Sequence, residues 1–149
     1  MLSLSHTLIS LPFAFYFQNP VLIFLAAFAF HFFLDTLLHW NIYPQNFKRF
    51  PFLLVGLDVI VGLLISWLML GETMWTLPVL AAIAGGNGPD ILHTLWIFIP
   101  KKIRSSYGFW LEPAFTWHDH LQFETTNLLH GLFSQVFVIG IAIILLSIA

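Results

Sequence analysis

Long apolar runs cover most of this chain, and short polar segments separate them. The main runs have about 20 residues each, the length at which a helix crosses the hydrocarbon core of a bilayer. Only 8% of the 149 residues are charged, against about a quarter in soluble domains. Lipid cannot hydrogen-bond a free backbone, so such runs must be helical. The sequence predicts an all-α fold, an integral membrane bundle of four to five transmembrane helices in a single domain over residues 1–149.

Proline, glycine and polar residues divide the bundle into segments. The predicted helices cover residues 4–17, 20–40, 51–70, 75–99 and 127–149. The fourth contains GGNGPD at 85–90, where glycines and a proline disfavour a regular helix, so we expect one discontinuous helix. The aromatic stretch at 107–123 is typical of a segment lying along the membrane interface.

All five lysines and arginines lie in the loops at 41–50 and 100–107. Basic loops favour the cytoplasmic side, and the short turn at 71–74 places both loops at the same end. We therefore expect the protein to lie in the cytoplasmic membrane of a bacterium or archaeon, with its functional site on the cytoplasmic side. The net charge of −2 argues against a nucleic-acid partner and leaves membrane lipid as the expected one. The oligomeric state does not follow from the sequence.

The segment HFFLDTLLHW repeats an ionisable residue every fourth position, at His31, Asp35 and His39. On a helix these three side chains project from one face. Ionisable groups inside an apolar span are costly and usually face a partner, a cavity or a metal. Asp35 has two oxygens, so it could bridge two ions, one bound by His31 and the other by His39. A set of satisfied polar groups in the core is the structural alternative.

Further imidazoles and carboxylates fall at the same predicted depth and extend this set of metal-ligand candidates. The candidates are His6, His31, Asp35, His39, Asp58, Asp90, His93, His118 and His120. The chain has no cysteine, so any metal would be held by nitrogen and oxygen atoms. That donor set predicts one or two zinc ions, and manganese or iron also fits.

The break at GGNGP has two interpretations. A half-helix beginning there would expose the backbone amides of Gly86, Asn87 and Gly88 to an anion such as a phosphate. Alternatively, the small residues mark a helix crossing with a packing kink.

Several motifs together resemble a known group of proteins. SHTLIS, HFFLDTLLHW, GPDILH and WHDHLQF resemble the small membrane-bound metal-dependent hydrolase-like proteins over most of the chain. More distantly, the H-x3-D-x3-H pattern and the PD element resemble the zinc-dependent phospholipase C group. The resemblance implies metal ligation by the following residues: His6, His31, Asp35, His39, Asp90 and His118. The PD element follows the H-x3-D-x3-H segment here instead of preceding it, and HDH stands where an HRG-x-x-HS-like stretch is expected.

The leading functional hypothesis is a membrane-embedded, zinc-dependent hydrolase, phospholipase-like, that acts on a lipid phosphoester or ester from the cytoplasmic leaflet. Asp119 or Glu124 would serve as general base. The alternatives are a non-catalytic metal-binding, proton-binding or transport protein, a haem or di-iron membrane protein, and a structural protein with a polar core.

Overall fold

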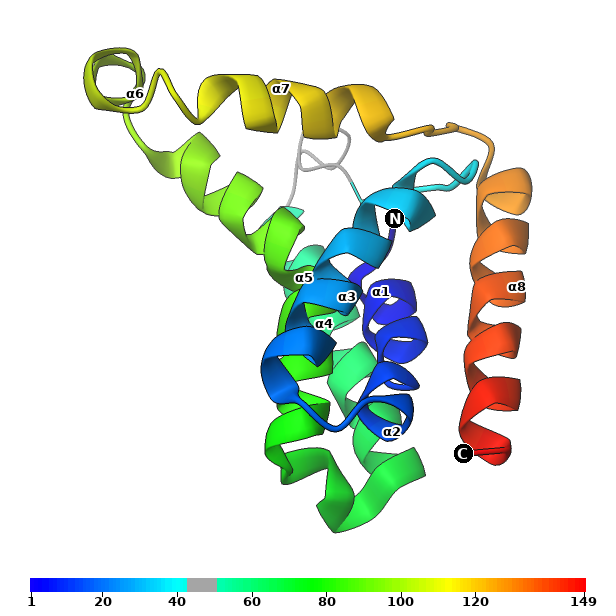
Figure 1. Cartoon of the computed structure of the whole chain (residues 1–149). Coiled ribbons are helices and arrows are strands. Elements are labelled where there is room, and N and C mark those ends of the chain that lie inside the picture. Colours follow the sequence, from blue (N-terminus) through cyan, green and yellow to red (C-terminus); the bar gives the residue numbers. More distant parts are fainter. Residues whose placement is uncertain (43–50) are drawn as a thin grey trace.

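The computed structural model describes residues 1–42 and 51–149 and confirms an all-α fold (Figure 1). The elements are α1 (Ser3–Ser10), α2 (Phe13–Tyr16), α3 (Pro20–Asp35), α4 (Pro51–Leu70), the 3-10 helix η2 (Gly71–Trp75), α5 (Leu77–Phe98), α6 (Lys101–Tyr107), α7 (Glu112–Leu121) and α8 (Leu128–Ser147). The described residues contain no strand, although an isolated parallel bridge joins His39 to Glu124. Lys48 and Arg49, which belong to the first predicted basic loop, lie outside the described residues.

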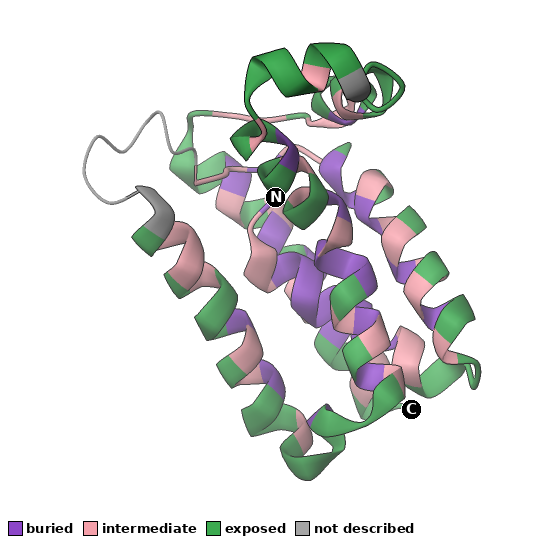
Figure 2. Cartoon of the chain, turned by 90° about the vertical axis from the view of Figure 1, so that its left-hand side faces the viewer, coloured by how far each residue is buried: buried purple, intermediate pink, exposed green. Residues whose placement is uncertain are grey.

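The short helix α1 lies at the centre of the fold. Every residue from Ser5 to Ser10 is buried, and α1 packs against α4, α5 and α8. Figure 2 shows buried residues gathered in the middle of the molecule and exposed residues on the outer helices. Helices α4 and α5 are antiparallel around η2, as the short turn predicts, but each contacts α1 far more than it contacts the other.

The first backbone N–H groups of α1 are hydrogen-bonded by side chains from other helices. Asp58 of α4 accepts from the N–H of Ser3 at 2.6 Å and of Leu4 at 3.3 Å. Gln135 of α8 accepts from the N–H of Leu2 at 3.0 Å. A helix start has no internal partner for these groups, and a carboxylate there is also favoured by the helix dipole. Tertiary contacts thus stabilise a helix too short to be stable alone.

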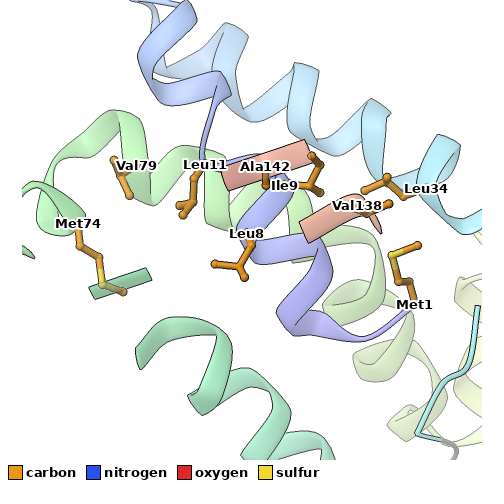
Figure 3. Packing of buried hydrophobic residues seen from close by; sticks show 9 residues of the cluster. All are labelled: Met1, Leu8, Ile9, Leu11, Leu34, Met74, Val79, Val138 and Ala142. Atoms are coloured by element: carbon orange, nitrogen blue, oxygen red, sulfur yellow. The ribbon is translucent and has the colours of Figure 1, made fainter. Parts of the chain in front are cut away.

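An apolar cluster packs around α1. Leu8 and Ile9 of α1 pack with Val79 of α5 and with Val138 and Ala142 of α8 (Figure 3). All five are at most 4% exposed. The cluster therefore anchors α8 to α1.

Helix α5 runs without interruption through GGNGPD, so the predicted discontinuous helix is wrong. A single internal proline, Pro89, removes one backbone donor but does not end the helix. The small residues instead permit a close crossing with α3. A Cβ on Gly85 would lie 2.4 Å from the carbonyl oxygen of Phe24 and 2.9 Å from Ala27 Cβ. The helix crossing of the alternative interpretation is therefore present at this motif.

Helix α3 ends at Asp35, five residues before the predicted end at position 40. The following segment is extended and pairs with the chain after α7. The N–H of Phe123 donates to Asp35 O at 2.8 Å, that of His39 to Phe123 O at 3.0 Å, and that of Thr125 to His39 O at 2.9 Å. This pairing between distant segments replaces the last turn of the helix. It also holds α7 across the end of the bundle (Figure 1).

Two helical segments in the described part of the chain are long and apolar enough to cross a membrane, Leu53–Trp75 and Leu128–Ser147. Helix α3 is apolar but shorter. Large apolar side chains on the two segments are exposed, among them Leu68 at 69% and Phe133 at 76%. Contiguous exposed apolar surface of this kind marks a membrane or a protein partner. The structure thus supports membrane association.

Replacing Gly85 with alanine should destabilise the protein by about 1–3 kcal/mol, because the new methyl group must force α3 and α5 apart. Gly56 of α4 is the matched control, since a Cβ there meets nothing within 4 Å. Gly56→Ala should be neutral or stabilise the helix by up to about 1 kcal/mol. Thermal unfolding in detergent measures both, and equal midpoints would contradict the close crossing.

Candidate metal centre

Four side chains from three helices converge at the end of the bundle that α7 covers. They are His31 and Asp35 of α3, Asp90 of α5 and His118 of α7. One ligand atom from each lies within 4.8 Å of all the others. Two imidazoles and two carboxylates at this separation form a group that could bind a metal ion.

Three of these ligand atoms form a nearly equilateral triangle. The distance between His31 Nε2 and His118 Nε2 is 3.3 Å. Asp35 Oδ2 lies 3.0 Å from the first nitrogen and 3.1 Å from the second. Metal–ligand distances of about 2.0–2.1 Å in a tetrahedral site place neighbouring ligand atoms about 3.3 Å apart. The triangle therefore has the dimensions of one face of a tetrahedral site.

Asp90 lies near the fourth corner and at the open side of the group. Its Oδ1 is 3.5 Å from His31 Nε2 and 3.7 Å from His118 Nε2, so it is held less closely than the other three. Its side chain is 34% exposed, whereas those of His31, Asp35 and His118 are at most 3% exposed. Asp90 is therefore the one of the four side chains with substantial exposure to solvent.

A backbone contact orients the His31 ring for ligation. Its Nδ1–H donates to the carbonyl oxygen of Gly86 at 2.8 Å. A carbonyl can only accept, so Nδ1 carries a proton, and Nε2 is the ring nitrogen that faces Asp35 and His118. Metal-binding histidines are usually oriented by such a bond from the other ring nitrogen. Gly86 thus contributes its carbonyl oxygen to the site.

His6 extends the group on the other side of Asp35. Its ring is fully buried and stacks on His31, with centroids 4.0 Å apart and an interplanar angle of 21°. His6 Nε2 lies 3.2 Å from Asp35 Oδ1, but neither ring nitrogen makes a hydrogen bond. The α-amino group of Met1 approaches the same oxygen at 3.0 Å. Each oxygen of Asp35 therefore has its own set of nitrogen neighbours.

His39 does not lie on the face that carries His31 and Asp35, because α3 ends before it. The prediction of a three-residue ladder on one helix is wrong at this position. His39 is fully buried, donates from Nδ1–H to Leu37 O at 2.8 Å and places Nε2 3.7 Å from Glu124 Oε1. Asn41 donates to the same Glu124 oxygen at 3.3 Å. These residues form a separate polar group beside the backbone bridge.

The other predicted ligands lie outside the four-residue group. Asp58 hydrogen-bonds the start of α1, because α1 separates α4 from α5. His93 places Nδ1 3.6 Å from Oδ1 of Asp119, whose side chain is 61% exposed. His120 is exposed, and its Nδ1–H donates to Thr116 O at 2.6 Å.

The predicted anion-binding residues, Gly86, Asn87 and Gly88, lie within the continuous helix α5, so no half-helix begins there. Asn87 instead ties α5 to α1. Its Nδ2 donates to Thr7 Oγ1 at 3.0 Å, and its Oδ1 accepts from Ser3 Oγ at 2.6 Å.

Sequence reasoning missed Gln135, a buried residue of α8. Its amide donates to Trp40 O at 2.8 Å, and its Oε1 accepts from Leu2 N–H and from Ser5 Oγ at 3.1 Å. Gly131, one turn earlier, lies so close to Trp40 that a Cβ would be 2.3 Å from its backbone nitrogen. A lone glutamine inside an apolar span is itself a signal, because intramembrane polar groups almost always have partners.

No protein-family model, curated protein or solved structure matches this chain.

Replacing His118 with alanine should weaken zinc binding by at least about 100-fold, because it removes one corner of the triangle. His120, on the same helix two residues away, is exposed and outside the group, so His120→Ala should retain the metal. Elemental analysis after dialysis against a chelator measures bound zinc per chain. Equal loss from the two variants would contradict the assigned group.

Proposed function

We propose that this chain is a membrane-embedded, metal-dependent hydrolase that acts on a lipid phosphoester or ester. The observation that carries the proposal is the asymmetry of the metal-ligand group. Three ligand atoms are tightly spaced and belong to buried side chains, whereas the side chain of the fourth residue, Asp90, is partly exposed. Catalytic zinc sites commonly use three protein ligands and keep one position open, whereas structural sites are closed.

We propose zinc as the metal, bound by His31, Asp35 and His118, with Asp90 at the fourth corner. Nitrogen and carboxylate donors suit zinc, and manganese and iron also accept them. His6 and the other oxygen of Asp35 would hold a second ion, since the His6 ring is buried and its nitrogens make no hydrogen bond. A bound metal would polarise a carbonyl or phosphoryl oxygen and lower the pKa of water toward neutrality.

Carboxylates near the metal-ligand group would orient the substrate and accept a proton. Asp90 is placed to orient a substrate or to accept a proton there. Asp119 and His93 lie close to each other, and the His93 ring is 5.4 Å from that of His118 between centroids. We propose Asp119 as the general base. Glu124 is next to His39 instead and is the less suitable candidate.

Apolar side chains on the outer surfaces of the helices support a location in the membrane. We propose that α3, α4, α5 and α8 cross the bilayer and that α7 lies along the interface. Exposed apolar side chains occur on all four helices, for example Leu22 at 56% on α3 and Leu95 at 57% on α5. The end with the metal centre also carries Lys101 and Arg104, which favours the cytoplasmic side.

A transport path is less well supported than a one-sided site. Transport needs polar groups that continue toward the opposite end of the bundle. Among the described residues, the charged side chain at that end is Glu72 in η2, which is exposed. The buried ionisable groups gather near α7.

A lipid-hydrolysis screen tests the function. Zinc-loaded protein in nanodiscs should hydrolyse one class among phospholipids, diacylglycerol phosphates and polyprenyl phosphates. Asp35→Asn should lower turnover at least about 100-fold, because Asp35 lies at the centre of the ligand group. Glu72→Gln removes an exposed carboxylate far from the site and should leave turnover unchanged. If the zinc-loaded wild-type protein hydrolyses none of these lipids, the result contradicts the hydrolase proposal.

A further inference from the structure

A second candidate site lies on the opposite side of α7 from the metal centre. Its cavity has a volume of about 810 Å³ and lies between α6 and α7. Pro113, Thr116, Trp117 and His120 line it from α7. Thr116, Trp117 and His120 follow Pro113 by three, four and seven residues, so the four lie on one helix face, whereas His118 points from the other side toward Asp35. The cavity is therefore separate from the metal-ligand group.

Two basic side chains of α6 line the cavity. Lys101 and Arg104, one helical turn apart, both line it. The Arg104 guanidinium lies over the Trp96 ring, 5.7 Å from its centroid, and its Nε is buried without a hydrogen-bond partner. Glu112 also lines the cavity, but it accepts a hydrogen bond from Trp96 Nε1 at 3.1 Å. Stacking on Trp96 thus holds the Arg104 side chain in place at the edge of the cavity.

Aromatic side chains form the apolar part of the same cavity. Phe109 and Trp117 line it, and each is 55% exposed. Aromatic rings beside basic groups are typical of the depth at which lipid headgroups lie. A volume of this size suits a ligand much larger than a single ion. The lining therefore matches a molecule with an anionic head and an apolar body.

We propose that this cavity binds the phosphate headgroup of an anionic membrane lipid. Lys101 and Arg104 contact the phosphate, and Phe109 and Trp117 contact the glycerol and the first carbons of the acyl chains. The inference goes beyond the proposed hydrolase and stands without it, because no metal-ligand side chain lines the cavity. A lipid held here would lie against the helix that carries His118.

Native mass spectrometry of the full chain in detergent tests the site with short-chain phosphatidylglycerol as the probe. Lys101→Gln should weaken binding about fivefold, the effect of one basic group near a phosphate. Lys102→Gln is the matched control, because this neighbouring lysine carries the same charge and does not line the cavity. Thr116→Trp fills the cavity without changing its charge and should weaken binding at least as much. Wild-type protein should bind phosphatidylcholine more weakly.

Three results would overturn the proposal. Equal weakening by Lys101→Gln and Lys102→Gln would indicate diffuse surface charge. Unchanged binding in Thr116→Trp would place the lipid elsewhere. Complete displacement of the lipid by millimolar inorganic phosphate would identify a site for the free ion. Zinc content, measured on the same samples, should be unchanged in all three variants, so a failure here is distinguishable from a failure of the metal centre.

Discussion

Burial of the Asp35 carboxylate constrains the rest of this structure. Its side chain is fully buried, and an isolated charge so placed costs several kcal/mol. Nitrogen atoms from His6 of α1, His31 of α3 and His118 of α7 surround it, together with the Met1 amino group. Each of these elements must therefore keep its position relative to the carboxylate. A divalent cation between the same atoms would compensate the charge in the same way, so the demands of folding and of metal binding coincide.

Hydrogen-bonded polar side chains are buried around α1 beside the apolar cluster that contains Leu8 and Ile9. Ser3, Thr7, Asn87 and Gln135 hydrogen-bond across helix boundaries, while large apolar side chains point outward. This distribution would suit a lipid environment, where apolar contact between helices gains little over contact with acyl chains. Hydrogen bonds and close backbone approach then hold the helices together. Gly85 of α5 and Gly131 of α8 permit the close backbone approach.

Helix α7 contributes residues to both the metal-ligand group and the basic cavity, from its two opposite faces. One face carries His118 into the metal-ligand group, and the other, with Trp117 and His120, lines the basic cavity beside α6. The pairing of the chain after α7 with the segment after α3 holds the helix across the bundle. A ligand on the outer face would therefore bear on the position of His118. The proposed headgroup site and the proposed catalytic site share this one short helix.

The sequence by itself determined the all-α class and the set of histidines and carboxylates from which a metal site could be assembled. Apolar runs of bilayer length leave a backbone no alternative to a helix, and His31 and Asp35, one turn apart, must share a face. Tertiary structure decided which candidates meet. His39 lies outside α3 because its backbone pairs with Phe123, more than 80 residues away. Asp58 hydrogen-bonds the first turn of α1 and does not join the metal-ligand group. GGNGPD became a helix crossing because α3 lies against it. Local periodicity carries no information about contacts between distant segments, and those contacts select the metal-ligand group from the larger set of histidines and carboxylates.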